Sequence, residues 1–277
     1  MNILNIEHIS KIYGEKVIFD DVSLGIHSGD KIGVIGVNGT GKTTLLKIIA
    51  KINEPDKGQI ICGNGIRVSY LPQNPEFPKK QSILEYVMDG KEHQDWKTES
   101  EAKTILTKLG IYDFDEGCDH LSGGQKKRVA LARTLVDPTE VLILDEPTAG
   151  LDVIARDSIL ELLREYMETE GRSILISSHI SSDLESLCDD IYMIDKGRIV
   201  LHENTDVLLD EYGLIKADEK QYELLDKQHI LKVKKEQYGY SCLTDERAFY
   251  AENYPQLAIE RGSVDKVITM MIKGEVL

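Results

Sequence analysis

A glycine-rich segment that ends in a lysine and two threonines is the first feature of the chain that could do chemistry. It follows the apolar run 31–35 and opens a stretch, 42–51, whose apolar residues recur at helical spacing. Glycines let backbone N–H groups fold around an anion, and a helix start adds positive dipole. We expect the Lys42 ammonium to hold the β- and γ-phosphates of a nucleotide and the Thr43 hydroxyl to bind Mg²⁺. The expected nucleotide-binding residues are Gly36, Asn38, Gly39, Gly41, Lys42, Thr43 and Thr44.

Two adjacent carboxylates, Asp145 and Glu146, directly follow another apolar run, 141–144. A buried strand would deliver them to its carboxyl end, where open α/β sheets bind ligands. We expect Asp145 to reach Mg²⁺, directly or through water, and Glu146 to orient and deprotonate the attacking water. By itself such a pair is more often part of a solvated loop, but beside a phosphate-binding loop the catalytic interpretation is favoured.

The segment 121–125, Leu-Ser-Gly-Gly-Gln, opens an expected helix that runs to about Val136. Ser122 and Gln125 have the spacing of a capping box. The two glycines between them leave N–H groups at the helix start open to a phosphate. An ordinary helix cap is the other explanation of this pattern.

The elements that must position these groups alternate in type along the chain. A helix is expected at about 153–169, and the pattern between 81 and 136 is helical. Alternation of strands and helices predicts an α/β fold with a parallel sheet. Strand-like runs lie within 2–35 and at 66–71, 141–144, 173–177 and 191–194.

After about residue 204 the pattern changes again. Six of the 12 tyrosines lie beyond that point, which suggests a second, smaller core. We expect strands near 229–234 and 257–260 and helices near 245–251 and 264–272.

Composition excludes several classes of protein. A chain of 277 residues with 41% hydrophobic and 29% charged residues is long enough for one large globular domain and a small appendage. Its net charge of −15 argues against general nucleic-acid binding, so no DNA partner is expected. We expect no signal peptide, because the amino terminus lacks a basic start and an unbroken apolar stretch. We expect no membrane-spanning helix, because no run of about 18 apolar residues occurs. The four widely spaced cysteines are expected to be reduced thiols.

Taken together, and in their order along the chain (36–44, 121–125, 145–146), the three motifs resemble those of the ABC ATPases. The resemblance covers about residues 2–204. It implies a P-loop NTPase fold of the ABC cassette type, with a mixed sheet core and a helical subdomain, that binds ATP and Mg²⁺. It also implies that 121–125 is the signature motif, which in this family closes on ATP held by the opposite subunit. The residues expected to bind that ATP are Ser122, Gly123, Gly124 and Gln125.

The same resemblance assigns four further residues. Tyr13, in Lys-Ile-Tyr-Gly, is similar to the aromatic residue that stacks on adenine, and Gln73, after Ser-Tyr-Leu-Pro, to the glutamine that senses Mg²⁺ and the γ-phosphate. Asp152 is similar to the D-loop aspartate and His179 to the switch histidine. Alone, Tyr13 is also explained as a surface aromatic and His179 as a structural histidine. The expected catalytic residues are Glu146, His179 and Gln73, and the expected Mg²⁺ ligands are Thr43, Gln73 and Asp145.

Two parts of the chain resemble different branches of this family. The stretch 67–148 is similar to the ABC-F proteins, soluble factors that act on ribosomes. From Ala149 onward, with Thr-Ala-Gly-Leu-Asp, the chain is similar to exporter ATPases, and 257–274 resembles the closing segment of drug- and peptide-exporting systems. A mosaic, natural or engineered, with a seam near 147–150 is one interpretation.

We expect an ABC nucleotide-binding domain at 1–204, with its helical subdomain at about 74–137, and a separable α+β accessory domain at 205–277. Docking of its last helix on the core is the alternative to separability. The expected function is ATP hydrolysis between two cassettes, this chain and either a second copy or a homologous ATPase. Hydrolysis would power a separate integral-membrane transporter subunit, and an exporter is favoured. The chain would be cytoplasmic and peripheral on the inner face of the cell membrane through that subunit.

The alternatives are an ABC-F-like translation or antibiotic-resistance factor bound to the ribosome, an ABC ATPase of DNA repair, and an engineered chimaera. The transported substrate is not specified, because the membrane subunit selects it.

Overall fold

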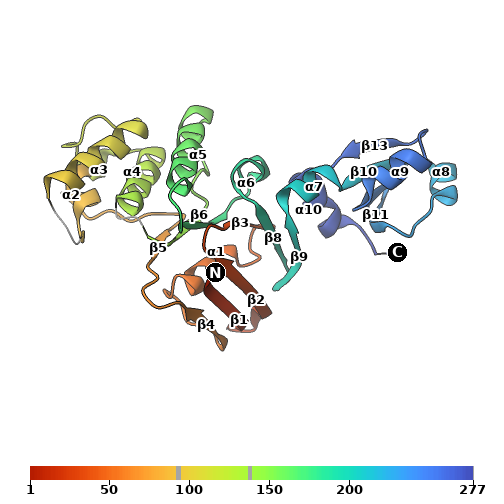
Figure 1. The fold of residues 1–277 in the computed structure, drawn as a ribbon, viewed down its shortest axis with the longest axis horizontal. Helices are drawn as coiled ribbons and strands as arrows, with labels where there is room; N and C mark the ends of the chain where they lie inside the picture. Colours follow the sequence, from red (N-terminus) through yellow and green to blue (C-terminus); the bar gives the residue numbers. More distant parts are fainter. Residues whose placement is uncertain (92–94, 137–138, 277) are drawn as a thin grey trace.

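The computed structural model of this chain describes residues 1–91, 95–136 and 139–276. Figure 1 shows an elongated molecule with a group of helices at one end and the tail after residue 204 at the other. The expected ends of the helical subdomain, at 137, and of the tail, at 277, lie outside the described residues. Within those described ranges, no helix is both long and apolar enough to pass through a membrane.

A six-stranded sheet runs through the middle of the molecule. Five strands are parallel, as expected, and an antiparallel strand lies at one edge. The strand at 141–145 is buried along its whole length because Leu142 and Leu144 enter one hydrophobic cluster while Val141 and Ile143 enter another. In spatial order the strands are β5 (Val68–Leu71), β6 (Val141–Asp145), β7 (Ser173–Ser177), β3 (Lys31–Ile35), β8 (Asp190–Asp195) and β9 (Arg198–Asn204).

A three-stranded antiparallel sheet covers one side of this core. It consists of β2 (Lys16–His27), β1 (Asn2–Tyr13) and β4 (Lys57–Cys62). Helix α1 (Lys42–Ile49) is enclosed with it, because Leu45 and Ile48 share a cluster with Phe19 of β2. The sequence pattern does not predict β4, since the side chains of that strand are mostly exposed and show no apolar alternation.

Helices cover the other face of the six-stranded sheet and continue beyond its edge (Figure 1). Capping boxes start two of them, with Ser82 before α2 and Ser122 before α4. The helix predicted at 153–169 is α5 and ends at Met167. The helices are α2 (Ile83–Met88), α3 (Trp96–Lys108), α4 (Gly123–Leu135), α5 (Val153–Met167) and α6 (Ser181–Leu187), with a 3-10 turn at Cys118–His120.

The tail is an α+β unit built on a four-stranded antiparallel sheet of order β11-β12-β10-β13. The four elements predicted there are present as β11, α9, β13 and α10, each within about two residues of its predicted start. The sequence pattern does not predict the other four. The tail elements are α7 (Thr205–Asp210), β10 (Gly213–Ala217), α8 (Glu219–Leu224), β11 (Ile230–Glu236), β12 (Gly239–Thr244), α9 (Arg247–Asn253), β13 (Ala258–Arg261) and α10 (Val264–Lys273).

The two faces of the tail sheet pack against different partners. On one face Ile215 and Cys242 belong to a cluster formed entirely by tail residues. On the other face Leu214 and Leu243 join α10 in the cluster that also holds the helices over the main sheet. The backbone N–H of Val264, at the start of α10, donates to the carboxylate of Glu185 on α6 at 2.7 Å. The tail therefore has its own core and also rests on α6.

Candidate functional site

The phosphate loop lies between β3 and α1 and uses glycine at positions where other residues would clash or strain. Gly41 has a φ of +101°, and a Cβ there would lie 2.6 Å from Ile18 Cγ2. Gly39 has a φ of +84° and faces open space on the side where a Cβ would stand. The loop is therefore closely packed at Gly41 and open at Gly39. Asn38 is exposed on the open part, and Thr43 and Thr44 are half-buried in the first turn of α1.

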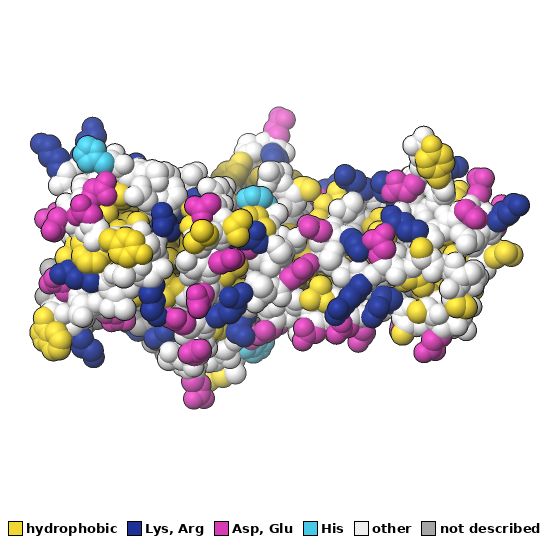
Figure 2. Space-filling view, turned by 90° about the horizontal axis from the view of Figure 1, so that it is seen from above, with side chains coloured by type: hydrophobic (Ala, Val, Ile, Leu, Met, Phe, Trp, Pro, Cys, Tyr) yellow, Lys and Arg dark blue, Asp and Glu magenta, His cyan; other side chains and the backbone are white. Residues whose placement is uncertain are grey.

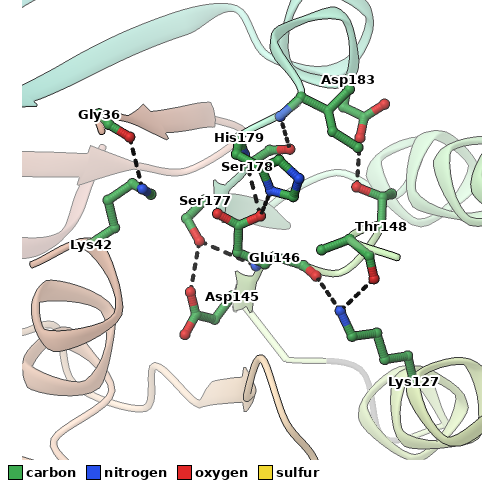
Figure 3. A network of polar contacts seen from close by, with 12 residues as sticks. Gly36, Lys42, Lys127, Asp145, Glu146, Thr148, Ser177, Ser178, His179 and Asp183 are labelled. Atoms are coloured by element: carbon green, nitrogen blue, oxygen red, sulfur yellow. Dashed lines mark hydrogen bonds and ion pairs between the residues drawn. The ribbon is translucent and has the colours of Figure 1, made fainter. Parts of the chain in front are cut away.

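Lys42 is the first residue of α1 and is only 7% exposed. Its ammonium donates to the carbonyl of Gly36 at 2.8 Å and so closes the loop on itself (Figure 3). Burial lowers the pKa of Lys42, and the nearby carboxylates of Glu146 and Asp145 partly oppose that shift. A buried ammonium held mainly by one carbonyl is well suited to receive an anion.

Asp145 ends β6 with its side chain 1% exposed. Its carboxylate accepts hydrogen bonds from Ser177 Oγ at 2.8 Å and from the Tyr70 hydroxyl at 3.3 Å. Burial, followed by the charge of Asp145, raises the pKa of Tyr70 far above its ordinary value, so that the phenol stays a donor. Asp145 is thus a buried carboxylate fixed by two donors, close enough to the lysine of the phosphate loop for the two charges to interact.

Glu146 is 5% exposed and has a left-handed backbone, with a φ of +52°. Its N–H donates to both the carbonyl and the hydroxyl of Ser177, at 3.1 and 3.2 Å. Its carboxylate accepts from the backbone N–H of His179 at 3.3 Å and makes a hydrogen bond with Nδ1 of the same histidine (Figure 3). The structure therefore brings together three predicted residues, Asp145, Glu146 and His179.

The signature segment lies at the start of α4. Ser122 Oγ accepts from Gln125 N at 3.3 Å, and Gln125 Oε1 accepts from Ser122 N at 2.9 Å. The capping box is therefore present. Ser122 and Gly123 are exposed, and Gly124 and Gln125 are half-buried, so the start of this helix is accessible to a second molecule.

Three other predicted residues lie on exposed parts of the chain. Asp152 is exposed and caps α5 by accepting from Ala155 N at 2.9 Å. Tyr13 is 48% exposed at the end of β1, and its hydroxyl accepts from Asn53 at 3.3 Å. Gln73 is exposed just beyond the end of β5. Their roles toward a nucleotide stay predictions.

Sequence reasoning missed a buried carboxylate and a half-buried lysine that hold the segment after Glu146. Asp183 on α6 is 0% exposed and accepts from Thr148 Oγ1 at 2.5 Å and from Nε of Arg156. Lys127 on α4 donates to backbone carbonyls of the same segment. An acidic residue at the start of a helix and a lysine in a basic run carry no distinct signal, so only their contacts reveal them.

The donor set fits MgATP better than a metal alone. Among the described residues no group of three or more His, Cys, Asp and Glu side chains could hold a metal ion. Mg²⁺ commonly uses one or two carboxylates together with substrate phosphates and waters. The buried carboxylate of Asp145 and the hydroxyl of Thr43, next to an open phosphate loop, are such a partial set.

Comparison with known proteins now decides the family. Residues 19–149 match the family model described as ABC transporter. Nod factor export ATP-binding protein I of Burkholderia orbicola (strain AU 1054) is 32% identical over 213 residues, 70% of this chain and 68% of that protein. The chain belongs to the ABC transporter family of ATP-binding proteins. It is an ABC-type ATPase with the cassette fold expected from its motifs.

Other ABC relatives differ in length and in the roles that their names state. The petrobactin import ATP-binding protein FpuD of Bacillus anthracis is 33% identical, over 75% of this chain and 83% of that protein. The uncharacterized ABC transporter ATP-binding protein YfmR of Bacillus subtilis (strain 168) is 32% identical over 262 residues, 80% of this chain. This chain spans only 41% of the length of YfmR.

Solved structures of ABC cassettes have the same fold. An ATP-binding subunit of an ABC transporter aligns with a TM-score of 0.67 and 25% identity, over 74% of this chain and 91% of that one. A dimeric cassette in a post-hydrolysis state, bound to ADP and Pi, aligns with a TM-score of 0.66 and 22% identity, over 73% of this chain and 98% of that one.

Proposed function

We propose that this ABC ATPase binds MgATP at the phosphate loop, hydrolyses it between two cassettes and thereby drives an integral-membrane transporter subunit. The observation that carries the proposal is the placement of Glu146. Its buried carboxylate is oriented by His179, stands beside Asp145 and shares the site with the ammonium of Lys42 (Figure 3). The proposed phosphate binder at the start of α1 and the proposed metal ligand and base at the end of β6 thus share one site.

Each group has a distinct part in phosphoryl transfer to water. The Lys42 ammonium would exchange the Gly36 carbonyl for phosphate oxygens, which repays its burial. Glu146 would accept the proton of the attacking water while His179 keeps the carboxylate turned toward the phosphates. Mg²⁺, held by Thr43 and Asp145, would supply charge neutralisation on the phosphate oxygens.

The second cassette follows from the exposed start of α4. Ser122 and Gly123 present a hydroxyl and helix-start N–H groups on the surface, where a phosphate would complete them. The dimeric cassette bound to ADP and Pi is a structural neighbour that assembles in pairs. We infer that this chain pairs with a second copy or a homologous ATPase, and that each ATP lies between Lys42 of one cassette and Ser122 of the other.

Export is the favoured direction of transport. The similarity to the Nod factor export ATP-binding proteins and the exporter-like sequence after Ala149 support it, whereas FpuD is named for import.

The chain would work at the cytoplasmic face of a membrane, through its transporter partner. Co-purification tests this: we expect the tagged chain to be recovered with detergent-solubilised membranes, and recovery with ribosomes instead would support the ABC-F-like alternative.

Replacing Glu146 by glutamine tests the proposed chemistry. Glu146→Gln keeps size and hydrogen bonding but removes basicity, so ATP hydrolysis should fall by roughly 100-fold or more. ATP binding should persist, and gel filtration with MgATP should show a trapped dimer. An active variant that stays monomeric with ATP would contradict both the base and the shared site.

A further inference from the structure

Lys127 makes two contacts that the proposed mechanism does not use. It lies on α4, two residues after the signature glutamine Gln125. Its ammonium donates to the carbonyl of Glu146 at 3.2 Å and to the carbonyl of Ala149 at 2.7 Å (Figure 3). Both carbonyls belong to the short segment 146–149 that leads from the catalytic carboxylate to the D-loop.

The backbone of Glu146 explains why its carbonyl needs a partner. Pairing between β6 and β7 ends at Asp145, one residue before it. The φ of +52° turns the chain out of the sheet, and a non-glycine residue keeps such a conformation only when its surroundings fix it. Ser177 holds the N–H side of this residue, and Lys127 together with the N–H of Ala149 holds the carbonyl side.

The charges around Lys127 suit this role. Burial lowers the pKa of Lys127, and the neighbouring carboxylates of Glu146 and Asp145 partly oppose the shift. The ammonium is therefore a partly desolvated cation between two backbone dipoles, where hydrogen bonds are stronger and more directional than at the surface.

A second helix holds the same segment from another side. Thr148 donates its hydroxyl to Asp183 of α6, which is buried and also paired with Arg156. The segment 146–149 is thus fixed between α4 and α6, and of these two helices only α4 begins with the exposed signature segment.

We propose that Lys127 is a positioning residue that ties the signature helix to the backbone of Glu146, so that docking of α4 on the opposite ATP aligns the catalytic carboxylate. This inference rests on the proposed function. Lys127 touches neither nucleotide nor water in this scheme; it acts through the Glu146 carbonyl. Loss of its ammonium should slow hydrolysis while leaving ATP binding at Lys42 unchanged.

The test replaces Lys127 by methionine, which keeps the length of the side chain and removes its donors. We expect kcat for MgATP to fall about tenfold, equivalent to about 1.4 kcal/mol in the barrier. KM and the ATP-induced rise in melting temperature should stay within about twofold of wild type. The matched control is Lys126→Met on the same helix, because the Lys126 ammonium lies over the Phe77 ring, 6.0 Å from its centroid. That control should keep wild-type kcat.

The outcomes separate the inference from the function beneath it. A wild-type chain without ATPase activity would defeat the proposed function, whereas an active wild type with an unchanged Lys127→Met would overturn only the role of Lys127. A rise in KM at constant kcat, or an equal loss in Lys126→Met, would overturn it too. If Lys127→Met does not melt cooperatively, kcat of Lys127→Gln is measured instead. A lower kcat is expected for that variant, and an unchanged kcat would overturn the role of Lys127.

Discussion

At the scale of single residues, the site groups are held in states that cost folding free energy. Lys42 keeps a buried ammonium whose pKa is lowered by desolvation, and Glu146 keeps a left-handed backbone, which costs of order 1–3 kcal/mol. Both costs have an explanation in the proposed function. Bound phosphates would stabilise the buried ammonium of Lys42, and the left-handed backbone of Glu146 places its carboxylate where His179 orients it.

Replacing Lys42 by methionine should therefore separate stability from function. We expect the nucleotide-free Lys42→Met variant to melt at least as high as wild type at neutral pH, because a costly buried charge is removed. The variant should lose stabilisation by ATP. Lys47→Met, on the same helix, should keep it. Differential scanning calorimetry with and without MgATP measures both, and a Lys42→Met variant that melts well below wild type would show that the ammonium stabilises the free protein.

The stability difference between Lys42→Met and wild type should depend on pH with a definite sign. The folded-state pKa of Lys42 lies below 10.5, the ordinary value kept in the unfolded chain. Between these two values the unfolded chain binds more protons, so wild-type stability rises with pH through that window. The advantage of Lys42→Met should therefore shrink as pH increases toward 10.5, and a constant advantage would contradict a desolvated ammonium.

At the scale of elements, the position of α4 matters most. Its amino end carries the capping box of Ser122 and Gln125, in which Ser122 is exposed, while its second turn is anchored through Lys127 to the segment after β6. A short helix held in this way is a rigid link between the surface that meets a partner and the end of the catalytic strand.

Mixing two inactive variants tests whether the site is shared between chains. Ser122→Arg should leave ATP binding by the monomer nearly unchanged and block closure, whereas Lys42→Ala should lose binding. The mixture should recover activity, because one composite site of the heterodimer is wild type. Ser82→Arg is a matched control that removes the equivalent cap of α2, worth about 0.5–2 kcal/mol, and it should stay active. Failure at every mixing ratio would mean that the sites are not shared or must act together.

Sequence could predict the parts of the site whose signals are local. The phosphate loop, the carboxylates after β6 and the capping box of α4 each depend on neighbouring residues, and the structure contains all three elements. Contacts across the fold gave no such signal. Lys127 meets Glu146 across 19 positions and Thr148 meets Asp183 across 35. Strand β4 has no sequence signal because its exposed side chains lack apolar alternation. The left-handed backbone at Glu146 has none either, because this residue is not a glycine.

At the scale of the whole molecule, the distribution of charge bears on nucleic-acid binding, and the tail determines the shape. The net charge is −15, and Figure 2 shows acidic and basic side chains interspersed on the face it presents, without a continuous basic stripe. That face offers no broad surface for nucleic acid. The elongated form comes from the tail, which extends the molecule away from α2 and α3 (Figure 1).

The packing of the tail bears on its proposed separability. Val264 and Val267 of α10 share a hydrophobic cluster with Leu184 and Leu187 of α6, and Glu185 binds the start of α10. This packing favours the alternative to separability, docking of α10 on the core, so a chain ending at residue 204 should expose this apolar face of α6 and give much less soluble protein. Helix α6 follows His179 directly, so loosening it should also disturb the contact with Glu146.

Expression of the 1–204 fragment beside a full-length Val267→Asp variant measures this effect. The variant keeps the tail's own core around Ile215 and Cys242 but places a charge in the shared cluster, so it should melt several degrees lower and lose ATPase activity in part. A soluble fragment that ATP stabilises by about 2.7 kcal/mol at a hundredfold excess over Kd would establish that residues 205–277 are a separable domain. The packing of α10 on α6 would then contribute little to the stability of the cassette, and the position of His179 would depend on the cassette alone.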